Sequence, residues 1–522
     1  MSEQTPKSLY WLPVLLAVVA AAGIYVGSLL FGGANSSNKE LQKLSQIFEV
    51  LDQQYVDKIN KEEIFERTIS EMLHKLDPHS NYIAAKDIKL LDEQTNAAFG
   101  GIGVRFLLFR DTICVTHVNM HSPAFLGGLK RGDRIVAVNG KAATGKSITN
   151  EKVMSRLKGL PGTKVKVTIY RKRKKINVTL TRNTIPISTV PCAYMLQPQT
   201  GYIQISQFSV PTAQEFHTAA LQLLSKGMNK LVLDLRGNSG GTMDAAIQIA
   251  DEFLPNGFLI LSSKGQHSEE KKFKATAAGV LEKIKVVVLI DAQSASASEI
   301  LAGALQDNDR ASIVGRRSYG KGLIQQDKRL QDGSNLRITI ARYYTPSGRS
   351  IQRPYKKGYE AYRQDEQKAF AEEFFKPDPN VFVDSLKFKT RKGRIVYGGG
   401  GIMPDVFVPG DTTGTSLYLS ELQWNGVFNA FAFDYLNQSG LAPKLTDFVK
   451  DFKIDEQLLR AFTAFAAKEF KIRVQPNEYQ HSKEKIRLLL KAEVARHLFL
   501  ENGYYRVINA QDKEIQRALA QF

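Results

Sequence analysis

Cysteine is almost absent from this chain. Only Cys114 and Cys192 occur among 522 residues, so neither a disulfide framework nor a cysteine-rich zinc site organises the fold. Both have apolar neighbours, which favours two buried thiols over a single bridge between them. The sequence also lacks internal repeats and metal-ligand motifs such as HExxH. We therefore expect no metal and no other cofactor.

Acidic residues are fewer than basic ones, 52 against 71, which leaves a formal net charge of +19. Such an excess fits nucleic-acid binding, attraction to an anionic membrane or a basic solvated surface. The densest basic run, residues 171–175, lies between two alternating segments, residues 165–170 and 176–180. This pattern predicts the tip of a β-hairpin rather than a phosphate-binding stripe. We favour the solvated surface and expect no nucleic-acid partner.

Long apolar runs are missing except for one at the N-terminus. Residues 9–31 are almost wholly apolar and uncharged, and they are numerous enough to cross a bilayer as a helix. We predict a signal anchor, with a cleaved signal peptide ending near residues 20–22 as the alternative. The expected protein is membrane-anchored by a single helix, and its folded body is exported to the periplasm.

The whole chain is too long for one core, because single hydrophobic cores rarely exceed roughly 250–300 residues. Its apolar periodicity changes between helix-like and strand-like at several places. We predict a multidomain α/β protein with these parts: an N-terminal membrane helix (residues 1–35), a helical cap (36–96), a β-rich module (97–184), an α/β core (185–411) and an α-helical C-terminal domain (412–522).

The α/β core is predicted from strand-like and helix-like segments that alternate along the chain. Such alternation implies parallel strands with crossover helices and a ligand crevice at the carboxyl ends of the strands. The predicted strands are residues 201–205, 231–235, 286–290 and 312–314, and the predicted helices are residues 213–224, 244–253 and 297–305.

Three turns at these strand ends have residues suited to catalysis. A cluster of Ser294, Ser296 and Ser298 opens a helix, which places a hydroxyl beside backbone N–H groups, although serine is also a common helix cap. Lys321 lies between two glycines, and a buried, neutral lysine can accept a serine proton. The glycine turn 237–241 offers N–H groups for an oxyanion.

The residues around these turns resemble the carboxy-terminal (tail-specific) processing proteases of peptidase family S41. The segment SASASEILAGALQD at residues 294–307, the turn Tyr-Gly-Lys-Gly at residues 319–322 and Gln325 match that family's active-site signature. The resemblance extends over most of residues 40–410. It implies a crotonase/Clp-protease-like core and a serine endopeptidase in which Ser296 is the nucleophile and Lys321 the base.

The same resemblance implies roles for further residues. Gln325 corresponds to the glutamine that holds the lysine, and Asp307 to the signature acid, for which we expect a supporting role. Gly240 and Ala297 are the predicted oxyanion donors. Gly241 is the alternative to Gly240, because this chain lacks the proline that the family usually has in the glycine turn.

The β-rich module resembles the PDZ domain of that family. Gly101, Ile102, Gly103 and Val104 would form its carboxylate-binding loop, in which successive N–H groups bind a free C-terminus. The implied partners are protein and peptide substrates with free C-termini, exported proteins among them, and in some bacteria an adaptor lipoprotein. The sequence leaves open the physiological substrates and whether the chain forms a homo-oligomer.

Three other interpretations remain at this stage. Ser239 lies in a turn similar to the nucleophile loop of chymotrypsin-like proteases, but the strand and helix alternation contradicts a two-barrel fold. A crotonase-like acyl-transfer enzyme would need neither Ser296 nor Lys321. An inactive PDZ scaffold at the membrane is the main alternative, and against it stands the presence of every predicted catalytic residue.

Overall fold

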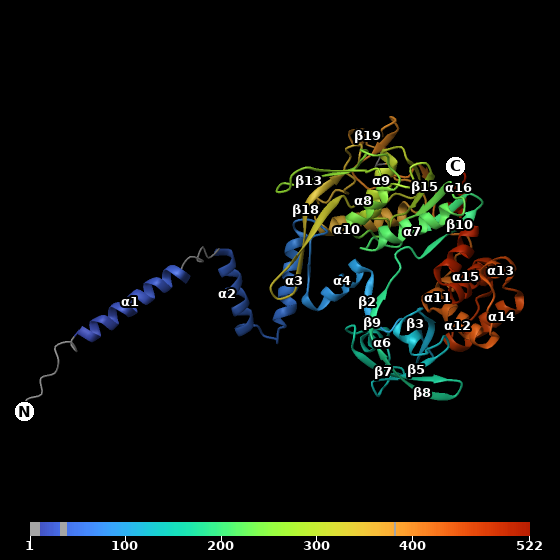
Figure 1. Cartoon of the computed structure of the whole chain (residues 1–522), viewed down its shortest axis with the longest axis horizontal. Coiled ribbons are helices and arrows are strands. Elements are labelled where there is room, and N and C mark those ends of the chain that lie inside the picture. The colour runs from blue at the N-terminus through green and yellow to red at the C-terminus, as the bar shows by residue number, and fades with distance from the viewer. Residues whose placement is uncertain (1–10, 32–38, 380–382) are drawn as a thin grey trace, which may run out of the picture. The chain divides into compact units, whose positions relative to one another are not determined.

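The computed structural model describes residues 11–31, 39–379 and 383–522 (Figure 1). The chain divides into two compact units, Met1–Met72 and Leu73–Phe522. The described part of the first unit is mostly helical, and its last helix continues into the second unit. The helices are α1 (Leu12–Phe31), α2 (Lys39–Gln54) and α3 (Lys61–His74).

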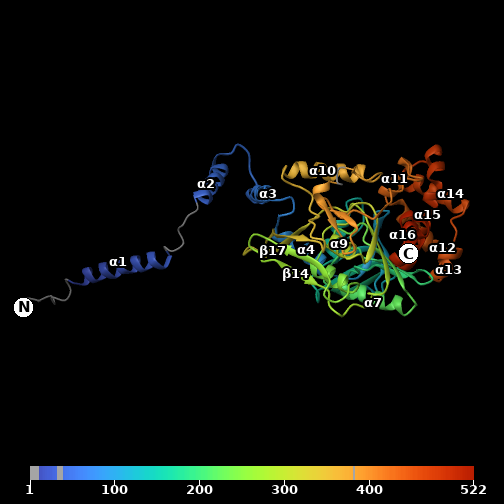
Figure 2. The same ribbon diagram turned by 90° about the horizontal axis from the view of Figure 1, so that it is seen from above.

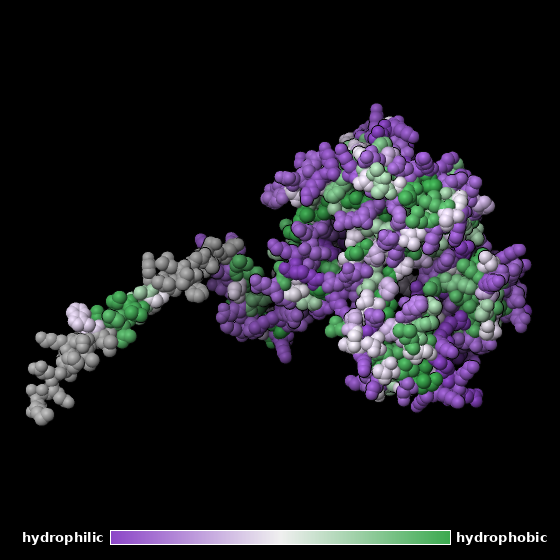
Figure 3. Space-filling view, viewed as in Figure 1, coloured by the Kyte–Doolittle hydropathy of each residue, from purple (hydrophilic) through white to green (hydrophobic). Residues whose placement is uncertain are grey.

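The predicted membrane segment coincides with α1. Figure 3 shows apolar side chains gathered over the described part of this helix. Judged on the described residues alone, however, no helix combines the length and apolarity needed to cross a bilayer, so the membrane helix is not confirmed. Residues 9 and 10 of the predicted segment, and the predicted boundary at residue 35, lie outside the described residues.

A six-stranded sheet in the order β10-β11-β12-β15-β16-β21 forms the centre of the second unit. All neighbouring strands are parallel except the edge strand β10 (Cys192–Gln197), which runs antiparallel to β11. The predicted strands and crossover helices are confirmed to within two residues at each end. They are β11 (Thr200–Gln204), β12 (Lys230–Asp234), β15 (Lys285–Ile290), β16 (Ala311–Gly315), α7 (Thr212–Leu224), α8 (Met243–Asp251) and α9 (Ala297–Asp307); β21 is Val406–Phe407.

Both faces of this sheet are buried, which is why its strands are continuous apolar runs. On β15, Val286 and Val288 pack with α7, α8 and α9. Val287 and Leu289 point to the other face, where Ile515 of α16 (Lys513–Leu519) packs against them. The last helix of the chain is therefore part of the core of the α/β domain and not only of a separate helical domain.

A second sheet lies beside the first and has the order β1-β18-β13-β14, with β17 pairing β18. It joins a segment near residue 80 to strands more than 200 residues later in the chain. The helix α10 comes from a charged stretch that follows this sheet. The elements are β1 (Asn81–Ile83), β13 (Leu259–Lys264), β14 (Lys271–Lys274), β17 (Leu323–Arg329), β18 (Asn335–Tyr344) and α10 (Tyr359–Glu372).

The β-rich module is a sheet in the order β3-β4-β5-β7-β8, with β6 pairing β5, so β3 is an edge strand. The predicted hairpin is confirmed: Lys172 and Arg173 form its two-residue turn, and both have positive φ. The elements are β3 (Val104–Phe109), β4 (Thr112–Val118), α5 (Pro123–Leu126), β5 (Arg134–Val138), β6 (Lys141–Ala142), α6 (Asn150–Leu157), β7 (Lys164–Arg171) and β8 (Lys174–Thr181). The pair β2 (Ala98–Gly101) and β9 (Asn183–Pro186) flanks it, after α4 (Ile88–Asn96).

Helices α11 to α16 gather at one end of the second unit (Figures 1 and 2). Leu107 and Phe109 of β3 pack in one buried cluster with Phe433 of α12, and Arg110 binds both carboxylate oxygens of Glu469 at 2.9 and 3.1 Å. These helices thus contact both the β-rich module and the α/β core. They are α11 (Leu417–Trp424), α12 (Val427–Ser439), α13 (Leu445–Asp451), α14 (Glu456–Phe465) and α15 (Pro476–Ile508).

Both cysteines are free and buried. Cys114 lies between the β-rich module and the helices, and Cys192 begins the edge strand β10 and packs in the cluster that contains Ile515. The buried thiols are confirmed, and the single bridge between them is wrong.

Candidate active site

Ser296 lies in a strained turn between β15 and α9. Its backbone has φ 54° and ψ −111°, a conformation that residues with a Cβ rarely adopt. Strained strand-to-helix turns of this kind present nucleophilic serines in other hydrolase folds. Such strain at a single polar residue suggests a functional position rather than an ordinary helix cap.

The other two serines of the cluster have structural roles. Ser294 and Ser298 are fully buried, and their hydroxyls donate to the carbonyls of Leu235 at 2.8 Å and Asn238 at 2.9 Å. Ser296 is only partly buried and lines a cavity of about 480 Å³ that Lys321 also lines. The structure therefore distinguishes Ser296 from its neighbours, which the sequence motif alone does not.

Lys321 is held by a chain of hydrogen bonds. Its Nζ donates to Oε1 of Gln325 at 2.7 Å, and Nε2 of Gln325 donates to the carbonyl of His79. Burial, assisted by the charge of Arg337, lowers the pKa of Lys321 to about 8, although Glu299 opposes the shift. A substantial fraction of this amine is therefore neutral at mildly alkaline pH. Within the described residues no hydrogen bond joins Lys321 to the Ser296 hydroxyl, although both face the same cavity.

Glu299 connects the serine turn to the lysine turn, and the sequence analysis did not identify it. Its fully buried carboxylate accepts from the N–H groups of Ser296 (2.8 Å), Gly320 (2.7 Å) and Lys321 (2.9 Å), and from the Ser318 hydroxyl (2.6 Å). Burial raises the pKa of this carboxyl, while the four donors oppose that shift. In the sequence, Glu299 could have been identified from its position three residues after Ser296, where a glutamate commonly completes a capping box.

Tyr343 makes a second connection between the two turns. Its buried hydroxyl lies 2.9 Å from the Lys321 carbonyl and 3.3 Å from the Ser296 carbonyl. The relative position of Ser296 and Lys321 is therefore fixed through their backbones as well as through Glu299.

The glycine turn lies against the serine turn. A Cβ added to Gly240 would lie 2.8 Å from Cβ of Ser296 and 3.0 Å from the nitrogen of Ala297, so only glycine fits there. The N–H of Gly240, however, donates to Oδ1 of Asn238 at 2.9 Å and is not free for an oxyanion. Among the described residues, the N–H groups of Gly241 and Ala297 have no acceptor. Gly241 thus fits the predicted donor role better than Gly240.

Asp307 lies at the far end of α9 from Ser296 and does not line the cavity. It forms an ion pair with Arg349 at 2.8 Å, and both side chains are fully buried. It also accepts from the hydroxyl of Ser347 at 2.6 Å. This position agrees with the supporting role expected for Asp307, because the carboxylate holds the segment after β18 against α9.

The glycine loop at the start of β3 has the geometry of an anion-binding nest. The carbonyls of Ile102 and Gly103 accept from the N–H groups of Ala124 and Asn119, both at 2.9 Å. In the described structure the N–H groups of Ile102 and Gly103 themselves donate to no protein acceptor. Two consecutive free N–H groups beside the edge strand β3, which starts at Val104 and follows the β2 residue Gly101, can bind a carboxylate.

Comparison with known families assigns most of these parts. A model of peptidase family S41 matches residues 199–358, and a PDZ domain model matches residues 100–181. A model of the N-terminal domain of the activating protease CtpB matches residues 31–87. A family of unknown function matches residues 418–500.

Similarity to curated relatives over most of their length shows the family. A carboxy-terminal-processing protease of Bartonella bacilliformis is 34% identical over an alignment of 345 residues, with a coverage of 63% of this chain and 79% of that protein. This chain belongs to the carboxy-terminal processing proteases of family S41. The carboxy-terminal processing protease CtpA of Bacillus subtilis is 33% identical over 67% of this chain and 75% of that protein. A solved photosystem II D1 C-terminal processing protease covers 73% of this chain and 96% of its own, with 24% identity and a TM-score of 0.37.

As an S41 protease, the chain has a serine-type peptidase core and a PDZ domain. Ser296, Lys321 and Gln325, which line the cavity, all lie within the S41 match. The family and the parallel sheet exclude a chymotrypsin-like two-barrel enzyme, and they do not favour an acyl-transfer enzyme or an inactive scaffold.

Proposed function

We propose that this protein is an endopeptidase that cuts with Ser296 as nucleophile and Lys321 as general base. One observation supports this most. Ser296, which is partly buried while Ser294 and Ser298 are fully buried, shares a cavity with Lys321, and burial lowers the pKa of that lysine to about 8. Gln325 orients the amine, because its Oε1 accepts from Lys321 Nζ.

In the proposed reaction, Nζ of neutral Lys321 takes the proton of the Ser296 hydroxyl as Oγ attacks the scissile carbonyl. The N–H groups of Gly241 and Ala297 stabilise the oxyanion. The protonated lysine then gives its proton to the departing amine, and an acyl-enzyme remains. Lys321 next deprotonates a water molecule, which hydrolyses the ester and restores the serine.

We further propose that the PDZ domain selects substrates by their free C-termini, through the loop from Gly101 to Val104. Its free N–H groups support this selection. The side chain of Ile102 is only 2% exposed and belongs to the domain core, so it contributes little to the choice of the last residue. The N-terminal apolar segment is proposed to anchor the enzyme, with exported proteins as its substrates.

The first prediction tests the proposed pair. Ser296→Ala and Lys321→Ala should each lower β-casein cleavage by the purified full chain at least 1,000-fold without changing its unfolding midpoint, because both are needed for attack (an order-of-magnitude expectation). Lys321→Arg should be equally inactive, since arginine stays protonated. Ser239→Ala should keep substantial cleavage. Activity in Ser296→Ala together with loss in Ser239→Ala would assign the nucleophile to the glycine turn instead.

A further inference from the structure

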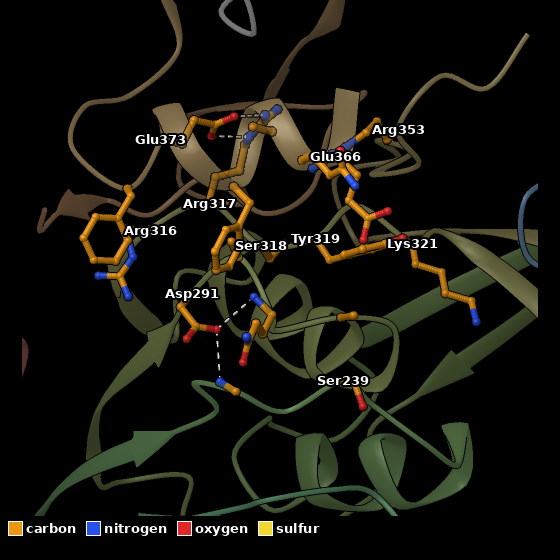
Figure 4. A pocket seen from close by; sticks show the side chains of 18 of the residues that line it. Ser239, Asp291, Arg316, Arg317, Ser318, Tyr319, Lys321, Arg353, Glu366 and Glu373 are labelled. Atoms are coloured by element: carbon orange, nitrogen blue, oxygen red, sulfur yellow. Dashed lines mark hydrogen bonds and ion pairs between the residues drawn. The ribbon is translucent and has the colours of Figure 1, made fainter. Parts of the chain in front are cut away.

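A second cavity, of about 870 Å³, adjoins the proposed reaction site. Lys321 and Ser239 line both cavities, so the two are continuous there. The wall opposite Ser239 is built from α10 and the segment after β18, as Figure 4 shows for Arg353, Glu366 and Glu373. Its volume is within the range of roughly 300–1,000 Å³ typical of ligand pockets. A peptide whose scissile bond lies at Ser296 can therefore extend into this cavity.

The lining of this cavity is rich in arginine, and most of its arginines are already neutralised. Four arginines and three acidic residues contribute to it, besides Lys321. Three of the arginines each contact a carboxylate: Arg317 binds Glu373, Arg363 binds Glu366 at 2.8 Å, and Arg316 binds Glu514. Arg353 differs, because no carboxylate in the described part of the chain lies within ion-pair distance of it.

Arg353 is positioned close to the lysine turn. Its backbone N–H donates to the carbonyl of Gly320 at 2.9 Å, and its guanidinium carbon lies 5.7 Å from the centre of the Tyr319 ring. Its Nε and Nη1 are buried and have no hydrogen-bond acceptor among the described residues. Guanidinium N–H groups removed from water without an acceptor cost free energy, and Arg353 also lines the cavity, so a carboxylate bound there would give these donors a partner once the guanidinium turns toward it.

We propose that Arg353 binds a carboxylate of the peptide substrate in this cavity. The carboxylate is either the C-terminal group of a short tail or the side chain of an aspartate or glutamate near the scissile bond. Arg353 thereby makes acidic or C-terminal segments better substrates at the reaction site itself, independently of the PDZ domain. A planar guanidinium suits this role because it forms two parallel hydrogen bonds to one carboxylate. The inference rests on the proposed endopeptidase activity.

The test compares kcat/KM for a matched set of internally quenched peptides derived from one cleavage site mapped in β-casein. One peptide has a free C-terminus, one is amidated, and others are amidated but have Glu or Gln at successive positions beside the scissile bond. The full-chain enzyme should cut the free-acid or the Glu peptide about tenfold faster than its neutral match, as expected for one charge-assisted hydrogen-bonded pair. The position and type of the preferred group identify which carboxylate is bound.

Arg353→Gln should reduce that preference to less than twofold while still cutting the neutral peptides. Arg353→Lys keeps the charge and should retain part of the preference, and unfolding midpoints of both variants verify their folding. Arg342→Gln is the matched control, because Arg342 is an exposed arginine of β18 outside the cavity. An unchanged preference in Arg353→Gln, or no preference in the unmodified enzyme, overturns the inference. Failure to cut any peptide, or equal cutting by Ser296→Ala, overturns the proposed activity instead.

Discussion

At the scale of single residues, the proposed mechanism makes the reactivity of Ser296 depend on the protonation of Lys321. Burial is the main cause that lowers the pKa of Lys321 to about 8, and the positive charge of Arg337 adds to it. Arg337 also holds Asp327 through two hydrogen bonds of 2.8 Å. A mutation at Arg337 therefore changes the charge near Lys321 and leaves the hydrogen bond from Lys321 to Gln325 in place.

This arrangement predicts the pH dependence of the enzyme. In the proposed mechanism the neutral lysine is the active form, so kcat/KM should rise about tenfold per pH unit below its pKa and level off above about pH 8. Arg337→Gln should raise the pKa of Lys321, because it removes a repelling charge, and should move the midpoint of the profile to higher pH. Arg329→Gln, at an exposed position of β17, is the control. A midpoint that stays in place or falls in Arg337→Gln would contradict the electrostatic account.

Glu299 is the residue on which the geometry of the site depends most. Glu299→Gln replaces one acceptor oxygen by an NH₂ group that must face N–H donors of the serine and lysine turns. We expect a loss of about 2–4 kcal/mol in the free energy of unfolding and a lower kcat. Denaturant unfolding and cleavage kinetics measure the two effects. Glu484→Gln, an exposed change on α15, should alter neither.

At the scale of elements, α16 supplies a carboxylate to two strand ends. Glu514 binds Arg316, which follows β16, and Arg236, which follows β12, the latter at 2.5 Å. These arginines open the segments that lead to the lysine turn and the glycine turn. The C-terminal helix therefore stabilises the site from outside the S41 match, which covers residues 199–358.

Glu514→Gln should remove the buried carboxylate that both Arg316 and Arg236 bind. The expected cost is about 2–4 kcal/mol in the free energy of unfolding, since the buried charge of Arg316 loses its carboxylate, whereas Arg236 keeps Asp234 and Asp512. Cleavage of short peptides should fall as well. Lys513→Gln on the same helix removes only exposed contacts, to Asp411 and to the Thr413 hydroxyl, and should cost less than about 1 kcal/mol. Equal, small effects of the two substitutions would show that α16 does not support the site.

At the scale of the whole molecule, the PDZ domain contacts the C-terminal helices through one face of β3. Phe109 packs on Phe465, and Arg105 binds Glu501 at 2.9 Å. The hydrogen-bonding edge of β3 is not paired with another strand among the described residues. A substrate tail can therefore add to this edge while the domain stays docked.

Capture of tails by this edge predicts a dependence on the C-terminal charge. Amidating the C-terminus of a folded, tailed substrate should slow its cleavage about tenfold, because the loop at Gly103 loses the anion it binds. Short peptides that do not reach the loop should be less affected. Gly103→Val should reproduce the effect from the enzyme side, since a Cβ there would lie 2.3 Å from Cβ of Ser122. Equal rates for amidated and free-acid tailed substrates would remove the PDZ loop from substrate selection.

The sequence by itself determined the strands and crossover helices of the α/β core, and it pointed to a few of the residues that line the cavity beside Ser296. Apolar runs marked the strands to within two residues, because a sheet buried on both faces needs apolar side chains in succession. Ser296 and Lys321 could be proposed because each lies in a local motif next to a strand end, whereas Gln325 was implied only by the family resemblance. The hydrogen-bond partners and the burial of these side chains were not predictable from local motifs.

Only the tertiary structure decided which groups pair with which. Glu299 receives donors from two turns, Asn238 takes the N–H of Gly240, and α16 packs on the core sheet although the sequence assigned it to a separate domain. That no carboxylate of the described residues lies beside Arg353 also follows from the fold. Hydrogen bonds, ion pairs and burial join residues far apart in the chain, so local patterns of polarity do not encode them individually.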